Sequence, residues 1–296
     1  MGAAFVLAAS LVLPAKAPPP AIPAREAVVV VPIENMYSGP DESLEVVSQA
    51  TLGQIVEVLE TTRAFAHIRT PDHYEGWVPR ATVSEYANAR IPRYASAGRV
   101  VGVTSLMANL YRDPDVTTAR PKALAPLSTR LEVTADGPSG RWLVLRLPSG
   151  DAAYVQVGDV RPEDPLAPRP RGSPEDLVAT ARRFLGTPYL WGGMTAQGID
   201  CSGLVSRVYH ANGVDLPRDA DQQFGDPGTA PVQVADLHPG DLLFFGSDSR
   251  SITHVGLYEG DSRFISATTH ETPVVREDRL DDPHWAAIYQ GARRPR

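Results

Sequence analysis

The sequence contains a single cysteine, Cys201, among 296 residues. One thiol forms no internal disulfide and excludes a zinc site built from several cysteines. The sequence also lacks a basic stripe: 28 Lys and Arg are outnumbered by 35 Asp and Glu, so nucleic acid is a poor partner. No apolar run approaches the roughly 18 residues of a membrane span. Burial of apolar side chains must therefore hold the chain together, and Cys201 is either a buried filler or a reactive thiol.

Turn-forming residues, in contrast, are abundant, with 28 Pro and 24 Gly. Because proline cannot lie inside helices or central strands, a long helical bundle, a coiled coil and a solenoid are excluded, and many short strands are expected. Hydrophobic residues make up 43% of the chain, which is enough for real cores. The length suggests about two or three domains.

The amino terminus has the pattern of an export signal. An apolar run over residues 3–13 is followed by Ala15-Lys16-Ala17, an Ala-x-Ala cleavage pattern. No Lys or Arg precedes the run, so an apolar tail without signal function is the alternative. Residues 18–23 are rich in proline and form a stiff tether. We therefore predict a signal peptide and tether over residues 1–25 and an exported protein, periplasmic or extracellular.

Residues 26–92 and 96–163 have the pattern of two copies of one unit. Each copy has a tyrosine before a Pro-Asp turn, then an alternating strand, then a strand that opens on an aromatic residue, and it closes on Gly, an aromatic residue and Val. Period-two alternation between turns indicates strands, and five or so short strands in about 60 residues make a small barrel. The histidines of the first copy stand at no metal-ligand spacing, and we predict no metal and no other cofactor.

A proline-rich linker at 165–170 leads into a last domain over residues 171–296. Its first helix begins at Ser173, an N-cap residue followed by proline and two acids. Apolar residues at helical spacing extend to Leu185, and Gly186 ends the helix.

Cys201 lies at the start of a second predicted helix. Asp200 is a suitable N-cap, and Leu204 and Val208 form an apolar stripe to which Cys201 does not belong. A thiol at a helix N-terminus faces free N–H groups and a partial positive charge, and both favour the nucleophilic thiolate. We therefore interpret Cys201 as a nucleophile rather than a filler.

A nucleophilic cysteine requires a base, and His254 is the candidate. It lies on a predicted strand over residues 253–258, after a turn and a buried strand that ends at Phe245. A lone strand histidine is more often a satisfied core residue, but beside this cysteine we interpret it as the general base and later acid.

These residues carry a family resemblance. Residues 173–296 resemble an NlpC/P60 cysteine peptidase, and the two preceding modules resemble bacterial SH3-like domains. The matching motifs, in the order of the family, are Pro188-Tyr189-x-Trp191-Gly192-Gly193, Asp200-Cys201-Ser202-Gly203-Leu204-Val205, Pro217-Arg218, Pro239-Gly240-Asp241-Leu242 and His254-Val255-Gly256. The resemblance implies an α+β fold: a papain-like catalytic domain preceded by two small SH3-like β-barrels.

The resemblance also implies an activity and a catalytic set. It indicates a γ-D-glutamyl-L-diamino-acid endopeptidase acting on peptidoglycan stem peptides with a free amino-terminal L-Ala. Cys201 would attack the carbonyl carbon, His254 would shuttle the proton, and Tyr189 would project its hydroxyl toward the oxyanion or substrate. We expect a monomer.

The same resemblance assigns residues to the substrate. Asp200 and Tyr74 would bind the ammonium group, together with an acid of the first module, for which Glu45 is the best placement and Glu42 the next. Arg218 would hold the D-Glu α-carboxylate, since a guanidinium fork suits a carboxylate. Ser202 and Trp191 complete the set by further substrate contacts.

One position departs from the family pattern. The residue that orients the catalytic imidazole lies twelve positions after the base and is often His, but here it is Ser266. We expect Ser266 to serve there with reduced efficiency, while His270 is an alternative if a turn brings it back. The departure motivates a second hypothesis, a catalytically weak or inactive wall-binding protein. A third hypothesis is another thiol enzyme of the same broad fold, such as an amidase or acyltransferase.

Overall fold

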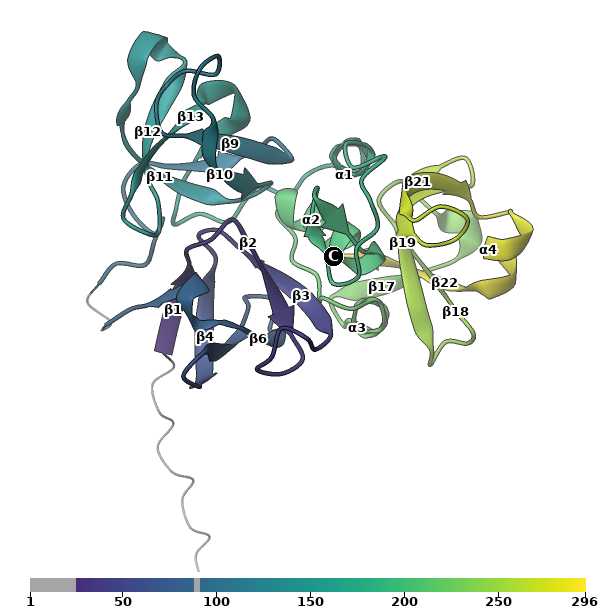
Figure 1. Ribbon diagram of the computed structural model, residues 1–296. Helices are drawn as coiled ribbons and strands as arrows, with labels where there is room; N and C mark the ends of the chain where they lie inside the picture. Colours follow the sequence, from purple (N-terminus) through teal and green to yellow (C-terminus); the bar gives the residue numbers. More distant parts are fainter. Residues whose placement is uncertain (1–24, 88–90) are drawn as a thin grey trace, which may run out of the picture.

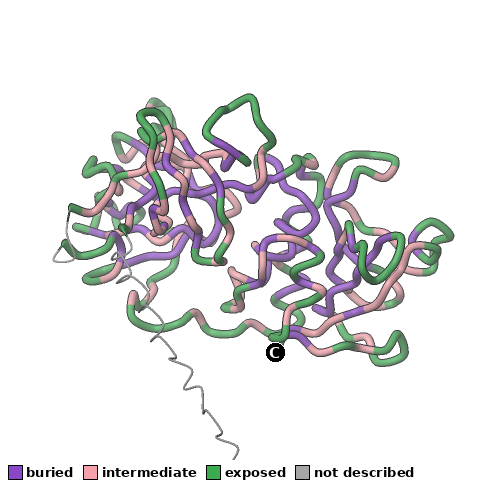
Figure 2. Tube along the Cα trace, turned by 90° about the horizontal axis from the view of Figure 1, so that it is seen from below, coloured by how far each residue is buried: buried purple, intermediate pink, exposed green. Residues whose placement is uncertain are grey.

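The computed structural model describes residues 25–87 and 91–296, which form three units (Figure 1). The predicted signal peptide and tether over residues 1–25 lie outside the described residues, apart from Arg25 itself. Buried backbone is concentrated inside the units, and exposed segments form the surface loops (Figure 2). Within the described part of the chain, no helix combines the length and the apolar character needed to cross a membrane.

The first unit is a seven-stranded antiparallel sheet. Its strands are β1 (Arg25–Val29), β2 (Ile33–Tyr37), β3 (Val46–Thr51), β4 (Ile55–Thr61), β5 (Phe65–Arg69), β6 (Glu75–Pro79) and β7 (Val83–Glu85), in the order β3-β2-β6-β5-β4-β1-β7. A 3₁₀ turn at Arg80–Thr82 precedes β7. The alternating residues Val56 and Val58 point into the core with Ile68 and Val78, as the period-two pattern predicts.

The second unit repeats this topology. Its strands are β8 (Val100–Val103), β9 (Met107–Tyr111), β10 (Pro121–Pro126), β11 (Arg130–Asp136), β12 (Trp142–Arg146), β13 (Ala152–Gln156) and β14 (Val160–Glu163), with 3₁₀ turns at Pro138–Gly140 and Val157–Asp159. The order β10-β9-β13-β12-β11-β8-β14 is that of the first unit with every strand number raised by seven. The sequence repeat is therefore real at the level of strand order, although each sheet has more strands than the five or so expected.

The third unit combines helices with a six-stranded sheet. Its strands are β17 (Thr229–Val232), β18 (Leu242–Gly246), β19 (Ile252–Gly260), β20 (Arg263–Thr268), β21 (Val274–Arg279) and β22 (Tyr289–Pro295), in the order β17-β22-β18-β19-β20-β21. A small hairpin pairs β15 (Met194–Thr195) with β16 (Gly198–Ile199). The helices are α1 (Pro174–Arg182), α2 (Cys201–Ala211), α3 (Ala220–Gly225) and α4 (Pro283–Ile288), with a 3₁₀ turn at Val234–Asp236.

The sheet of the third unit is covered on both faces. Leu242 and Phe244 pack with the residues of α1 and α2, whereas Leu243 and Phe245 pack with Trp285 of α4. Alternating residues of β18 therefore enter two different cores, which explains its unbroken apolar run.

The first two helices begin as predicted. Ser173 and Asp176 form a capping box at the start of α1 with Pro174 at the first position, and the Asp200 side chain accepts the Gly203 N–H at the start of α2. Helix α1 ends at Arg182, earlier than predicted, and Leu185 is 40% exposed. The buried apolar residues expected for this helix therefore end at Phe184, in the turn that follows α1.

Candidate active site

The start of α2 places Cys201 against the central strands of the sheet. Cys201 is only 8% exposed and belongs to the same core cluster as Val255 of β19. The backbone N–H groups of Val255 and Ser202 are directed at the sulfur closely enough to lower its pKa. Since Val255 directly follows His254, the thiol lies beside the strand that carries the predicted base.

The protonation state of Cys201 differs from the expectation of a thiolate. Burial raises the pKa of the Cys201 thiol from 9.0 to about 12, and the nearby Asp200 carboxylate raises it further, while the two backbone N–H groups act in the opposite direction. Desolvation and the carboxylate of the N-cap residue raise the thiol pKa more than the helix N-terminus lowers it, because the thiolate loses its hydration when it is buried. The resting thiol is therefore neutral.

The imidazole of His254 is held by aromatic rings. It stacks on Trp285 with ring centroids 5.0 Å apart at 25°, and the Phe245 ring centroid lies 5.7 Å away. Burial lowers the pKa of His254 to about 4, and Asp278 opposes this shift. No hydrogen bond joins the His254 and Cys201 side chains, both of which the structure describes. The resting pair is thus a neutral thiol beside a neutral imidazole.

Ser266, the residue expected to orient the base, makes no hydrogen bond to it. It is fully buried on β20, the neighbour of β19, and its Oγ has no hydrogen-bond partner among the described residues. The same holds for Nε2 of His254. His270, the alternative, stacks on His284 with ring centroids 3.7 Å apart and meets Trp285 edge-on. The aromatic contacts, rather than a polar partner, fix the ring of His254.

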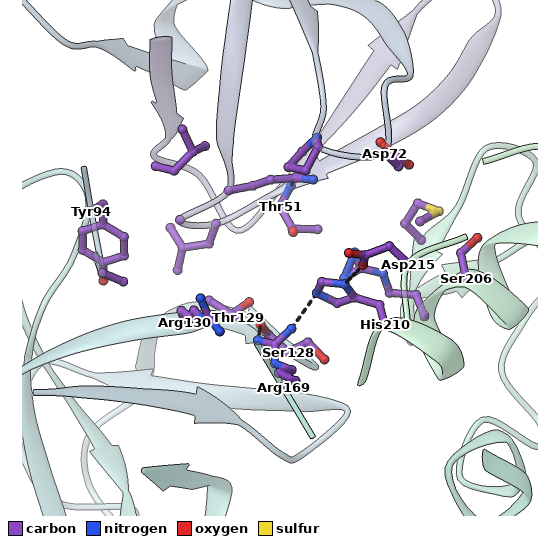
Figure 3. A pocket seen from close by; sticks show the side chains of 18 of the residues that line it. Thr51, Asp72, Tyr94, Ser128, Thr129, Arg130, Arg169, Ser206, His210 and Asp215 are labelled. Carbon is purple, nitrogen blue, oxygen red and sulfur yellow. Dashed lines mark hydrogen bonds and ion pairs between the residues drawn. The ribbon is translucent and has the colours of Figure 1, made fainter. Parts of the chain in front are cut away.

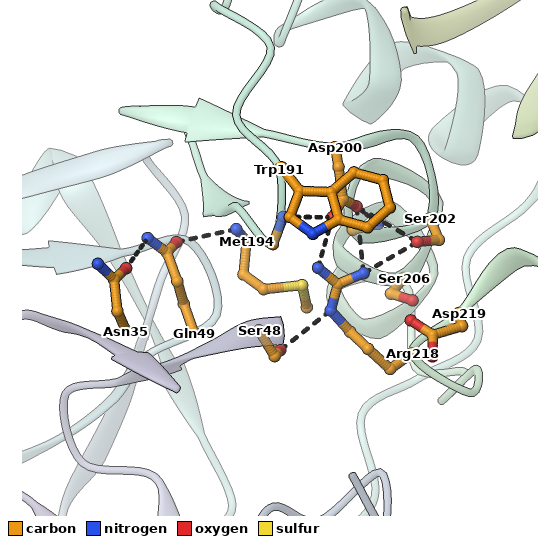
Figure 4. Close-up of polar contacts among 12 residues, drawn as sticks. Asn35, Ser48, Gln49, Trp191, Met194, Asp200, Ser202, Ser206, Arg218 and Asp219 are labelled. Carbon is orange, nitrogen blue, oxygen red and sulfur yellow. Dashed lines mark hydrogen bonds and ion pairs between the residues drawn. The ribbon is translucent and has the colours of Figure 1, made fainter. Parts of the chain in front are cut away.

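Arg218 lies in a buried ion pair that the sequence did not reveal (Figure 4). It is 1% exposed, and its Nη1 and Nη2 bond to the two carboxylate oxygens of Asp200 at 3.1 and 2.6 Å. Nη1 also bonds to Ser202 Oγ at 2.9 Å, and Nε bonds to Ser48 Oγ of the first unit at 3.0 Å. In this arrangement the guanidinium has no free fork for a substrate carboxylate, and the role expected of it from the sequence stays a prediction.

The carboxylate of Asp200 has further partners. Its Oδ1 accepts the Gly203 N–H at 2.7 Å and its Oδ2 accepts the Gly192 N–H at 2.9 Å, in addition to Arg218. Gly192 has φ of 75°, and a Cβ there would lie 2.9 Å from Val46 of the first unit. Asp200 therefore ties together the helix start, the Trp-Gly-Gly turn and Arg218, and both its oxygens are used internally.

Asp219 also borders the site, although the sequence did not indicate it as a site residue. It follows Arg218 directly, caps α3, and lies close enough to the Tyr74 hydroxyl of the first unit to influence its pKa. Burial raises the pKa of Asp219, and the Arg218 charge opposes this shift. Burial also raises the pKa of Tyr74, followed by the charge of Asp219. Its position in the sequence could have pointed to it, because it is an acid that directly follows the motif arginine and stands at the start of a helix.

Two further predicted residues meet between the first and third units. Trp191 is 62% exposed, and its Nε1 donates to Glu45 Oε1 at 3.0 Å. Nearby, the Met194 N–H donates to Gln49 of β3 at 2.9 Å. The first unit therefore borders the site through Glu45, Ser48 and Tyr74. Glu42 has no contact of this kind among the described residues.

Tyr189 lies close to Cys201. Burial raises the pKa of Tyr189, and the next largest cause is Cys201 in its thiolate form. Bridges to Ile199 on one side and, through Pro188, to Val274 on the other hold its segment in place. Within the described residues, no group of three or more His, Cys, Asp or Glu side chains is arranged to bind a metal ion.

A thiol at the first turn of a helix, set against an antiparallel sheet with a histidine on the adjoining strand, defines the class of a candidate thiol enzyme of α+β fold. Comparison with known proteins agrees with this class. The model of the NlpC/P60 family matches residues 186–294, and that of the bacterial SH3 domain matches residues 30–84.

Curated relatives and a solved structure extend the match over the chain. Dipeptidyl-peptidase 6 of Lysinibacillus sphaericus is 30% identical over 266 residues, which cover 87% of this chain and 93% of the relative. A γ-D-glutamyl-L-lysine dipeptidyl-peptidase of Bacillus cereus is 30% identical over 264 residues, 83% of this chain and 74% of the relative. The crystal structure of an NlpC/P60 family protein from Bacillus cereus has a TM-score of 0.79 and 25% identity, covering 91% and 99% of the two chains. The chain belongs to the NlpC/P60 family.

Proposed function

We propose that this protein is an exported cysteine peptidase that cleaves the γ-D-Glu to L-diamino-acid bond of cell-wall stem peptides with a free amino-terminal L-Ala. The position of Cys201 at the start of α2, beside the strand of His254 and bordered by the first unit, carries the proposal. The names of the γ-glutamyl peptidase relatives support it. We further propose that the third unit is papain-like and that the second unit, with its repeated strand order, is a second SH3-like domain.

In the proposed reaction, Cys201 Sγ attacks the γ-carbonyl carbon of D-Glu while its proton passes to His254. The collapse of the tetrahedral intermediate breaks the C–N bond, and the His254 proton leaves with the amine of the diamino acid. Water then attacks the thioester, losing a proton to His254, and the acid product and the thiol are released. Because thiol and imidazole are neutral at rest, the proton transfer accompanies attack as general base catalysis.

The border with the first unit supports selection of a free ammonium group. Asp219 with Tyr74 and Glu45 with Trp191 place two carboxylates where the first unit meets the site. An ammonium group gains a charge-assisted hydrogen bond from either carboxylate. Since both oxygens of Asp200 are engaged, we assign this recognition to Asp219 and Glu45 and treat Asp200 as the residue that holds the site together.

The test is hydrolysis of L-Ala-γ-D-Glu-diamino-acid peptides by the purified protein, with Cys201→Ala as the control. We expect cleavage by the wild type and none by the variant, and a loss of at least tenfold in kcat/KM when the L-Ala amine is acetylated. Equal rates for wild type and Cys201→Ala would refute the proposal. Best cleavage of the acetylated peptide would instead favour an amidase-type activity.

A second candidate function is a catalytically weak or inactive wall-binding protein. The unpartnered Ser266 Oγ and His254 Nε2 favour it, since a base without a polar partner loses the group that stabilises its protonated form. Wild type and Ser266→His should be assayed together, with circular dichroism to check folding, because position 266 is fully buried. Wall binding without turnover, and turnover gained by Ser266→His, would establish this alternative.

A further inference from the structure

A cavity lies where the three units meet, separate from the thiol site (Figure 3). Its volume is about 470 Å³, which is in the range of small-molecule sites. The first unit contributes the turn from Thr51 to Ile55, the second contributes Arg130, the linker contributes Arg169, and α2 contributes Arg207 and His210. The cavity therefore exists only when all three units are assembled.

Arg207 is the unusual member of this lining. Its Nε is completely buried and has no hydrogen-bond partner among the described residues. No ion pair in the described chain reaches its guanidinium, and burial lowers the pKa of Arg207 because the charge has lost its water. A guanidinium whose buried Nε has no acceptor is costly, so the site is suited to a ligand that supplies one.

The other lining cations are already neutralised. Arg130 and Arg169 share Glu163, at 2.9 and 3.0 Å. Arg169 also donates to the Ser128 carbonyl at 2.6 Å, and Arg93 bonds to Glu26 at 2.7 Å. Among these lining arginines of the described chain, Arg207 is therefore the one that lacks a hydrogen-bond acceptor.

Two carboxylates face the same space. Asp72 of the first unit and Asp215, which follows α2, line the cavity, and both act on the charge of Arg207 without contacting it. Asp72 Oδ1 accepts the Thr70 hydroxyl, and Asp215 Oδ1 is bonded to His210 Nδ1, so the second oxygen of each has no partner in the described structure. A polyanion such as phosphate would meet both negative charges. A ligand that carries a cation beside its anion would instead place the cation near these carboxylates.

We infer that this junction cavity binds a small zwitterion, an amino acid or short peptide, whose carboxylate is held by Arg207 and whose ammonium faces Asp72 and Asp215. The inference is independent of the chemistry at Cys201. Occupation would stabilise the assembled form, since the ligand contacts groups from the first unit and from α2 together.

The test uses diglycine as the probe, with N-acetylglycine and glycinamide as matched probes that each lack one charge. The midpoint of thermal unfolding of the full chain is followed against probe concentration at constant ionic strength. We expect a saturable rise with diglycine, at least tenfold weaker binding of the other two, and at least tenfold weaker diglycine binding in Arg207→Met and in Asp72→Asn.

Three controls make the result decisive. Arg141→Met removes an exposed arginine that does not line the cavity and should keep the wild-type response. Asp219→Asn should keep it as well, which separates this site from the proposed substrate site. Far-UV circular dichroism checks that the variants are folded. The absence of a saturable rise in the wild type, an equal rise in folded Arg207→Met, or equal binding of N-acetylglycine would overturn the inference.

Discussion

At the scale of single residues, the reactive group of this protein is a thiol whose surroundings suppress its charge. The helix N-terminus and two backbone N–H groups favour a thiolate, but burial and Asp200 dominate. In the proposed reaction, such a thiol stays unreactive until a substrate arrives and His254 takes the proton. Suppression of the charge also protects the single cysteine from oxidation, because the thiolate is the form that oxidants attack.

Alkylation of Cys201 tests this protonation state directly. With the pKa raised to about 12, the thiolate fraction stays small at neutral pH and rises about tenfold per pH unit between pH 6 and 9. The rate of reaction with iodoacetamide should follow that rise without a plateau and remain below that of free cysteine. Because the chain has one cysteine, mass spectrometry of the adduct measures the rate, and the guanidinium-unfolded protein is the control. A plateau below pH 7 would mean that the thiol and His254 form an ion pair at rest.

A second residue-scale prediction concerns the buried pair of Asp200 and Arg218. Arg218→Ala leaves the Asp200 charge buried without its partner, which is expected to cost about 3–5 kcal/mol of unfolding free energy. Arg99→Ala is the matched control, since the Arg99–Asp136 pair is exposed on both sides and should change stability by about 0–1 kcal/mol. Urea unfolding of the two variants gives the comparison. Similar losses in both would show that the buried pair is not a main support of the site.

At the scale of elements, the start of α2 was predictable and its partners were not. The N-cap Asp200, the first-turn position of Cys201 and the strand of His254 follow from local sequence, because capping and periodicity involve near neighbours. The bond of Arg218 to Ser48 joins positions 170 residues apart, and no local pattern encodes it. The neutral state of Cys201 likewise depends on desolvation by the whole core. The long-range bond of Arg218 and the protonation state of Cys201 could therefore not be predicted, because both depend on tertiary packing.

The close approach of α2 to the Trp-Gly-Gly turn gives an element-scale prediction. A Cβ on Gly203 would lie 2.3 Å from the Gly193 carbonyl oxygen and 2.9 Å from Asp200 Oδ1. Gly203→Ala should therefore displace the helix start, and we expect a loss of about 1–3 kcal/mol in stability and of activity, despite the better helix propensity of alanine. Gly225→Ala is the control, because a Cβ there meets nothing within 4 Å. Equal stability of the two variants would show that the backbone at Gly193 yields easily.

At the scale of the whole molecule, the three units are joined by side chains rather than by a shared sheet. The first unit contacts the third through Ser48 and Gln49, and the linker residue Arg169 donates to the Ser128 carbonyl of the second unit and bonds to His210 of α2. The proposed substrate selection by the first unit would depend on these contacts, since they bring Tyr74 to Asp219. Stability of the assembly and specificity are therefore properties of the same interfaces.

The linker contact makes this assembly sensitive to acid. Arg169 Nη1 lies 2.7 Å from His210 Nε2, and an arginine only donates, so Nε2 must accept and Nδ1–H must donate to Asp215. Burial lowers the pKa of His210 below 6.5 in the folded state. The unfolded chain then binds a proton that the folded chain does not, so stability falls as the pH drops below about 6.5.

His210→Gln keeps an acceptor for Arg169 without a titrating group. The pH dependence of unfolding between pH 7 and 5 should accordingly be weaker in His210→Gln than in wild type, with proteolysis at residues 163–172 as a second measure. His254 titrates in both proteins and cancels in the difference, so identical slopes would mean that the proton is not taken up at His210.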